Sequence, residues 1–214
     1  ELAHAFAGYE LALASGVDAP AANGRRSRFG NLIFSRLAIG QVWRHSLPWP
    51  AAPDVPSMPR VALEAVVSAP FGPLRVVTTH LEYYAASHRA AQIERLAEIQ
   101  AEALASRRNV AKPGPFQTRA RPQSAIVCGD FNLRPDDAEH RQMLEGGFVD
   151  AWETLHAGER HPPTFCVHEH QHGDTPYCCD FVFVTPDLVP RLKSIRVDGA
   201  TQASDHQPVI LELR

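Results

Sequence analysis

The stretch Ile126-Val127-Cys128-Gly129-Asp130-Phe131-Asn132 decides more about the fold of this chain than any other. Its apolar half predicts a buried strand, and its polar half follows at the carboxyl end, where open α/β sheets tend to place their sites. In an extended segment, residues two apart point to the same side. Asp130 and Asn132 are therefore expected to face one site, although the same pattern also fits a polar turn after a strand.

Apolar runs on both sides of this stretch predict a chain dominated by strands. The expected strands are residues 31–39, 61–67, 74–80, 125–128, 180–185, 192–198 and 209–213. The second and third flank Pro70-Phe71-Gly72-Pro73 and are expected to form a hairpin. From Ser87 to about Arg107, the spacing of apolar residues predicts a helix with Ser87 as its N-cap. The apolar stripe expected to face the core is Ala90, Ile93, Leu96, Ala97 and Leu104. The expected class is therefore α/β or α+β.

The length, composition and net charge of the chain limit the classes of protein to which it can belong. A chain of 214 residues, 44% hydrophobic and 21% charged, can bury one sizeable core, so we expect one domain over residues 1–214. The net charge of −3 excludes a global positive field that would gather nucleic acid. The four cysteines lack the spacing of a disulfide framework, and no apolar stretch reaches the length of a membrane span. We expect a monomeric, cytoplasmic protein whose Ala/Arg/Pro-rich usage is typical of bacteria.

Two further polar groups stand at the ends of predicted strands. Asp205 and His206 are adjacent, so on an extended chain they project to opposite sides and cannot pair with each other. A natural carboxylate for His206 is Asp180, which begins an apolar run and could fix the imidazole tautomer and favour its protonated form. His80 ends another strand. Taken singly, such residues are also typical of turns, caps and structural histidines.

Taken together and in order, these motifs resemble those of the endonuclease/exonuclease/phosphatase superfamily. The ordered set is Gly30-Asn31-Leu32-Ile33-Phe34-Ser35-Arg36, Thr78-Thr79-His80-Leu81, Arg89 with Gln92, Gly129-Asp130-Phe131-Asn132, Asp180-Phe181-Val182-Phe183-Val184 and Ser204-Asp205-His206. The resemblance spans almost the whole chain. It implies a four-layer sandwich, in which two packed mixed β-sheets are flanked by helices and the site lies at one end.

The resemblance implies a catalytic role for each of five residues. Asp130 would position or activate the attacking water, and Asn132 would bind the scissile phosphate or the nucleophile. His206 would donate to a phosphoryl oxygen, and Asp180 would orient its ring. His80 would hydrogen-bond the phosphate. Such chemistry is mostly positioning and charge stabilisation, which these groups can supply.

The resemblance also implies a bound metal, Mg²⁺ or Mn²⁺, that Asp205 would help to hold. The family normally opens with a strand ending in Asn and a Gln-Glu pair whose Glu is a principal ligand, and neither occurs in this sequence. Glu1 is a weak substitute, because helix-like residues follow it. We therefore expect the domain to be N-terminally incomplete. Asn31 is expected near the site as a substrate-binding residue, with Arg89 and Gln92 as structural partners.

These observations predict Mg²⁺-dependent hydrolysis of a phosphate ester, by a phosphodiesterase or nuclease. A small-molecule or lipid phosphomonoesterase, or a member that binds phosphate ligands without turnover, are the alternatives. DNA or RNA could be held by the basic stretch 107–121 and the tryptophan-bearing loop 43–49, unless these are a solvated loop and a core cap. Six of the eleven histidines lie between His140 and His172, and with Cys166 some of them (His168, His170, His172) could bind zinc or form a polar loop.

Overall fold

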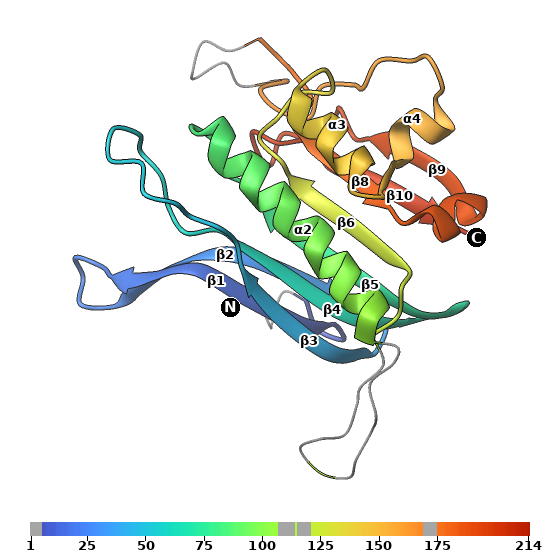
Figure 1. Ribbon diagram of the computed structural model, residues 1–214, viewed down its shortest axis with the longest axis horizontal. Helices are drawn as coiled ribbons and strands as arrows, with labels where there is room; N and C mark the ends of the chain where they lie inside the picture. Colours follow the sequence, from blue (N-terminus) through green and yellow to red (C-terminus); the bar gives the residue numbers. More distant parts are fainter. Residues whose placement is uncertain (1–5, 107–113, 115–120, 169–174) are drawn as a thin grey trace.

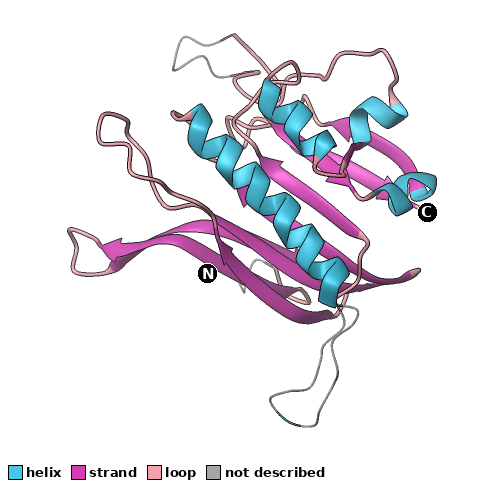
Figure 2. Cartoon of the chain, in the orientation of Figure 1, coloured by secondary structure: helices cyan, strands magenta, loops and turns pink. Residues whose placement is uncertain are grey.

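A six-stranded mixed sheet forms the centre of the molecule (Figures 1 and 2) in the computed structural model, which describes residues 6–106, 114, 121–168 and 175–214. In spatial order its strands are β3 (Ile39–Ser46), β4 (Val61–Ala69), β5 (Gly72–His80), β6 (Ala125–Asp130), β8 (Asp180–Val184) and β7 (Val149–Asp150). Neighbouring strands pair antiparallel except β5 and β6, which are parallel. A parallel pair needs a crossover connection, and α2 (Ala86–Ser106) supplies it.

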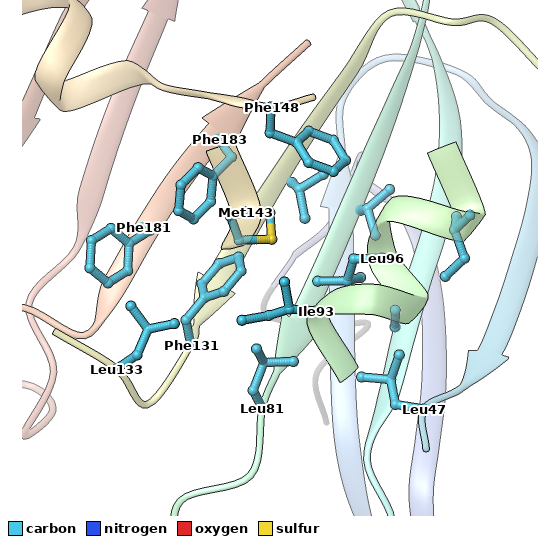
Figure 3. Close-up of a cluster of buried hydrophobic side chains, with 14 of the residues drawn as sticks. Leu47, Leu81, Ile93, Leu96, Phe131, Leu133, Met143, Phe148, Phe181 and Phe183 are labelled. Carbon is cyan, nitrogen blue, oxygen red and sulfur yellow. The ribbon is translucent and has the colours of Figure 1, made fainter. Parts of the chain in front are cut away.

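Helices α2 and α3 (Ala138–Glu145) cover one face of this sheet (Figure 1). Their apolar side chains pack with those of the strands in a single cluster (Figure 3), which includes Leu47, Leu81, Ile93, Leu96, Phe131, Leu133, Met143, Phe148, Phe181 and Phe183. Ile93 and Leu96 are 1% and 2% exposed, as the predicted helical stripe requires. Because burying each such side chain contributes about 1.5–3 kcal/mol, this cluster holds α2 across the parallel pair.

Two small sheets cover the opposite face. β1 (Glu10–Pro20) and β2 (Arg26–Ser35) form one antiparallel pair, which packs on β4 through Ala12, Ala14, Val61 and Leu63. β9 (Leu192–Val197) and β10 (Val209–Leu213) form the other, which packs on the sheet together with α4 (Ala151–Leu155) and the short 3-10 helix η2 (Pro186–Arg191). The predicted fold class is confirmed, but the second layer consists of two separate two-stranded sheets instead of one mixed sheet.

Most predicted elements occur with small changes of boundary, and the N-terminal third differs most. The predicted strand 31–39 is wrong as a single element, because β2 ends at Ser35 and β3 begins at Ile39, with the hydroxyl of Ser35 bonded to the backbone of Leu37 between them. β3 lies in a region that the sequence left irregular. β1 was not predicted at all, and residues 1–5 lie outside the described residues.

The long helix also differs in detail. α2 begins at Ala86, so Ser87 lies inside the helix and is not its N-cap. Leu104, expected on the buried stripe, is 44% exposed, while Ile99 and Ala103 are buried instead. The apolar face thus turns away from Leu104 in the last helical turns. Among the described residues, no helix has both the length and the apolar character that crossing a bilayer requires.

Candidate active site

A cavity of about 350 Å³ opens at the carboxyl ends of β5 and β6. Its lining combines polar groups with a wall of aromatic and apolar side chains: Phe29, Met58, Arg60, His80, Tyr83, Tyr84, Asp130, Asn132, Phe165, Tyr177, Cys179 and His206. Because β5 and β6 are parallel, their ends reach the same edge of the sheet. The cavity therefore collects the side chains that follow both strands.

Strand register aligns three of the predicted site residues in one row. His80 on β5 lies opposite Asp130 on β6, and Asp130 lies opposite Asp180 on β8. The Nε2 atom of His80 is 3.3 Å from Oδ2 of Asp130. The alignment follows from the central position of β6, which pairs with β5 on one side and with β8 on the other.

The turn after β6 brings Asn132 back toward Asp130. Gly129, with φ of +136°, allows β6 to approach β5 closely, because a Cβ at this position would lie 2.0 Å from the carbonyl oxygen of Thr79. Asn132 has φ of +51°, a conformation that Asn tolerates better than most residues. Its backbone N–H donates to Oδ1 of Asp130 at 2.9 Å, and its side-chain Nδ2 donates to the carbonyl of Leu81 at 2.9 Å. The two residues thus share the site through a tight turn, not through the alternation of a strand.

His206 enters the site from a bridge to Phe165. Its Nδ1 is 2.8 Å from Oδ2 of Asp180, and its Nε2 faces Oδ2 of Asp130 at 3.9 Å. The hydroxyl of Thr164 donates to the same Asp180 oxygen at 2.7 Å and accepts the backbone N–H of Asp180 at 3.1 Å. Asp180 is therefore fixed from two sides and can hold the imidazole of His206 with Nε2 directed into the cavity.

The site shifts the pKa values of its titratable groups in different directions. Burial, reinforced by the negative charge of Asp180, raises the pKa of Asp130 to about 6. Burial and the nearby Arg60 guanidinium lower the pKa of His80 to about 4. Burial opposes protonation of His206, but the hydrogen bond and charge of Asp180 outweigh it and raise the pKa of the imidazole. The cavity thus presents a carboxylate that can accept a proton, and an imidazole whose protonated form, which can donate one, is favoured by Asp180.

Asn31 and Asp205 lie farther from the cavity than the sequence suggested. The side-chain amide of Asn31 donates to the carbonyls of Val61 at 2.7 Å and Thr78 at 3.2 Å, and it lines a small adjoining cavity with His80. The carboxylate of Asp205 is exposed, and its Oδ1 accepts a hydrogen bond from Ser204. Neither residue lines the main cavity. Asn31 is placed to support the strands behind His80.

Two groups of side chains in the described part of the chain could hold a metal ion. One consists of Asp130, Cys179 and His206, and the other of His140, Asp150 and His161. Within each group, the possible ligand atoms lie within 4.8 Å of one another. The first belongs to the cavity, and the second lies apart from it.

The sequence did not single out the wall of the cavity. Glu82, almost fully buried, accepts the backbone N–H groups of Tyr83 at 2.9 Å and Tyr84 at 3.0 Å through Oε1. Its Oε2 forms an ion pair with Arg60 at 3.7 Å. The signal was present as Glu82-Tyr83-Tyr84 directly after the His80-Leu81 motif, but the folded loop was needed to show that the rings line a cavity.

Several other residues that the sequence singled out have defined partners in the structure, and others lie outside the described residues. Gln92 accepts the N–H of Glu82 and donates to the carbonyl of Pro48, and Arg89 donates to the carbonyls of Glu82 and Tyr83, so both anchor the loop after β5 as expected. Most of the basic stretch 107–121 lies outside the described residues, as do His170 and His172 of the zinc alternative. Arg121 is described, and it is paired with buried Glu64.

Comparisons with known proteins agree with this geometry. The sequence profile of the Endonuclease/Exonuclease/phosphatase family matches residues 2–206. No curated protein sequence matches the chain. Among solved structures, the whole chain superposes on a Neisseria 3′ phosphatase bound to a product DNA hairpin (TM-score 0.65, 20% identity, 82% of that chain) and on a mannosyl-6-phosphatase of Bacteroides thetaiotaomicron (0.66, 19%, 79%).

A third structure, an endonuclease/exonuclease/phosphatase from Beutenbergia cavernae, gives a TM-score of 0.65 at 20% identity over the whole chain. The chain spans 55% of the length of that protein. At these identities the structural matches establish a common fold.

Proposed function

This chain belongs to the endonuclease/exonuclease/phosphatase family of phosphoesterase hydrolases, and we propose that it hydrolyses phosphodiester bonds with the help of Mg²⁺ or Mn²⁺. One observation carries the proposal. Nε2 of His206 lies 3.9 Å from Oδ2 of Asp130 in the lining of the cavity, while Asp180 holds the other ring nitrogen of His206. A proton acceptor and a proton donor thus lie side by side in one cavity.

The protein's own groups suggest a division of labour. The carboxylate of Asp130 accepts a proton from a water, whose oxygen attacks phosphorus as the P–O ester bond breaks, and the departing alcohol oxygen takes up a proton from solvent water. His206 donates a hydrogen bond from Nε2 to a phosphoryl oxygen as negative charge develops there. Asn132 uses one amide N–H for the carbonyl of Leu81, which leaves the other for the phosphate or the attacking water. Neutral His80 adds a further contact beside Asp130.

The metal requirement is a separate part of the proposal. The family is generally dependent on divalent metals, and Mg²⁺ and Mn²⁺ prefer oxygen ligands. Around the cavity, the described residues bring one carboxylate, Asp130, together with the thiol of Cys179 and the imidazole of His206. Asp205 is exposed, and Glu1 lies outside the described residues. These described residues do not by themselves assemble an all-oxygen site.

The aromatic wall favours a substrate that carries an aromatic group. Tyr83 and Tyr84 are 46% and 63% exposed and lie edge to face, with ring centroids 4.8 Å apart. Phe165 and Phe29 complete the wall next to His206 and His80. Stacking on such rings contributes about 1–3 kcal/mol per base in single-stranded complexes. We therefore propose a nucleotide ester, at the end of a DNA or RNA strand or in a smaller molecule, as the substrate.

Removal of a terminal phosphate is the second candidate function. The solved structures of the same fold include a 3′ phosphatase and a mannosyl-6-phosphatase. A cavity of about 350 Å³ accommodates one sugar phosphate or one nucleotide. The aromatic wall favours the nucleotide of these two.

The test is hydrolysis of bis-p-nitrophenyl phosphate and p-nitrophenyl phosphate with Mg²⁺ or Mn²⁺, with and without EDTA. We expect turnover of the diester that EDTA abolishes and that His206→Ala lowers about 10³-fold, because the variant loses the donor to the phosphoryl oxygen. His168→Ala is the matched control, since His168 is another histidine of the C-terminal part of the chain. Among the described residues it donates to the carbonyl of Gly199, and it does not line the cavity. It should keep full activity.

The pattern of substrates then decides between the candidates. Faster turnover of the monoester, or of a 3′-phosphorylated oligonucleotide over its dephosphorylated form, would favour the phosphatase. Turnover that falls steeply with salt would indicate a substrate contacted through several phosphates. No turnover of the two aryl esters or of an oligonucleotide in either metal would contradict the enzyme and leave a phosphate-binding protein.

A further inference from the structure

A second cluster of imidazole and carboxylate groups lies outside the cavity described above. His140 comes from α3, Asp150 from the junction of β7 and α4, and His161 from the segment before β8. Oδ2 of Asp150 is 2.9 Å from Nε2 of His140 and 3.0 Å from Nε2 of His161. The two histidines are 21 positions apart in sequence, so the fold brings both ring nitrogens to a single carboxylate oxygen.

The cluster is among the most buried polar groups of the described chain. The side chains of His140, Asp150 and His161 are 3%, 1% and 7% exposed. Phe181 packs against both imidazoles, with ring centroids 5.2 and 5.4 Å away. Buried charge of this kind is retained only when it is paired or coordinates a metal.

The carboxylate of Asp150 is oriented by the fold itself. Its Oδ2 lies between the ring nitrogens of His140 and His161. Oδ1 accepts the backbone N–H groups of Trp152 at 2.7 Å and Glu153 at 3.2 Å, as the N-cap of α4. The backbone thus holds one oxygen and leaves Oδ2 directed at the two imidazoles.

An acidic opening leads to the cluster. A cavity of about 530 Å³ reaches His161, and its lining includes the acids Asp136, Glu153 and Glu159 together with Arg160. Such an entrance attracts cations and repels anionic phosphate esters. This opening differs from the aromatic, imidazole-bearing cavity around His206.

We propose that His140, Asp150 and His161 form a binding site for a transition metal, with Zn²⁺ as the ion that best fits two imidazoles and one carboxylate. Each imidazole binds as the neutral ring through Nε2, which moves its proton to Nδ1, and Asp150 binds through Oδ2. Three protein ligands leave a fourth position, which water from the acidic cavity fills.

Occupation of this site would fix the segment that supports the active site. His161 lies three residues before Thr164, whose hydroxyl holds Asp180 against His206. The ion would tie this segment to α3 and α4. We therefore expect Zn²⁺ to raise the thermal stability of the protein without taking part in hydrolysis.

The test is performed on the EDTA-treated His206→Ala protein, so that the cavity group of Asp130, Cys179 and His206 cannot capture the ion. Zn²⁺ binding is measured by competition with a chromophoric chelator, and Co²⁺ binding by visible absorption. We expect one equivalent of Zn²⁺, an increase in Tm, and the strong Co²⁺ bands of a four-coordinate site. Because binding is read directly, the result does not depend on whether the protein hydrolyses phosphate esters.

Added to this background, His161→Gln removes one ligand and His156→Gln is the matched control. His156 lies in the same segment and stacks on Trp152 at 4.0 Å, but it is outside the cluster. Loss of a group that merely orients a ligand weakens metal binding about 10–100-fold, so loss of an imidazole ligand should weaken it at least ~100-fold. His156→Gln should bind Zn²⁺ as the background protein does.

Two results would overturn the proposal. One is Zn²⁺ affinity in the His161→Gln protein equal to that of the control. The other is a background protein that neither binds an equivalent of Zn²⁺ nor changes its Tm, which would identify the cluster as a hydrogen-bonded tie between α3, α4 and the segment. If His161→Gln fails to fold, the Co²⁺ spectrum of the background protein decides, since a six-coordinate, weakly absorbing spectrum contradicts the site.

Discussion

Asp130 and Glu64 are both carboxylates of the central sheet, yet their pKa values move in opposite directions. Glu64, with a fully buried side chain, is bonded to His45 at 2.9 Å and to Arg121 at 3.0 Å, and it pairs with Arg75 at 3.4 Å. Burial opposes its ionisation, but these partners outweigh it and lower the pKa of Glu64 to about 2. Burial and the charge of Asp180 instead raise the pKa of Asp130 to about 6.

The two pKa values differ because the two carboxylates accept different numbers of hydrogen bonds. Glu64 accepts hydrogen bonds from Arg121 and His45 that satisfy both of its oxygens. Asp130 has one backbone N–H from Asn132 and shares its surroundings with a second acid. A carboxylate that is fully paired stabilises the fold, whereas one that is short of donors remains reactive. The sheet thus separates a stabilising acid in β4 from a reactive acid at the end of β6.

Replacement of the reactive acid should have the largest effect. We expect Asp130→Asn to lower kcat about 10³-fold or more, because the carboxylate that accepts the proton of the attacking water is lost. The same change should stabilise the fold by up to about 3 kcal/mol, since a carboxyl whose pKa rises from 3.8 to about 6 on folding is destabilising above pH 6. Steady-state kinetics and urea unfolding at pH 7 measure the two effects. Loss of stability together with activity would contradict the comparison.

Replacement of the paired acid should have the opposite signature. Glu64→Gln removes the charge that Arg75 and Arg121 share, and leaving buried cations unpaired costs about 3 kcal/mol or more. kcat per folded molecule should not change, because Glu64 does not line the cavity. Glu94→Gln, at an exposed position of α2, is the control and should leave both quantities unchanged. A fall in kcat of the folded Glu64→Gln protein would show that the two regions are coupled.

The reactive region, which consists of Asp130 and the groups aligned with it, could be predicted from the sequence. Each of these groups lies at one end of a strand. His80, Asp130 and Asp180 follow or begin apolar runs, and the pairing of three adjacent strands then aligns them. Local pattern was sufficient here, since it fixes both the strand and the edge at which the polar residue emerges. The chemical roles of these residues stay predictions until activity is measured.

The stabilising region, which consists of Glu64 and its partners His45, Arg75 and Arg121, could not be predicted in the same way. Glu64 and Arg75 each interrupt an apolar strand, where a charge is typical of a solvent-facing side chain. Glu64 also pairs with Arg121, which lies 57 positions away in the sequence, and no local pattern signals such a contact. β1 escaped prediction for a related reason, because its Leu11 and Leu13 are 43% exposed while the smaller Ala12 and Ala14 are buried.

Acid should weaken the stabilising region over a defined range of pH. The pKa of Glu64 is lowered from 4.5 to about 2 on folding, so its contribution to stability is complete above pH 4.5 and is lost as pH falls toward 2. The side chains that pair with this carboxylate are those of His45, Arg75 and Arg121. Its titration is therefore not coupled to a second carboxylate in these pairs. The difference in unfolding free energy between wild type and Glu64→Gln should therefore shrink between pH 4.5 and pH 2. A constant difference across this range would contradict the assignment.

The smallest effect should come from Thr164, which acts on the reactive region only through Asp180. Its hydroxyl donates to Oδ2 of Asp180, the oxygen that also holds His206, so Thr164→Val should loosen the imidazole without removing it. Groups that orient a ligand in this way typically change function about 10-fold, and we expect kcat to fall by about that factor with KM unchanged. Thr164→Ser keeps the hydroxyl and should restore kcat.

Thr185→Val provides the matched control for this change. Thr185 is also buried, at the opposite end of β8, and its hydroxyl accepts the N–H of Ala125. Both valine variants should lose some stability, because each leaves buried polar groups without a partner. Only Thr164→Val should lower kcat, because only its hydroxyl reaches the acid behind the catalytic imidazole. If both variants lose kcat equally, the effect of Thr164→Val comes from packing in general. The hydrogen bond from Thr164 to Asp180 would then have no specific effect on catalysis by Asp130 and His206.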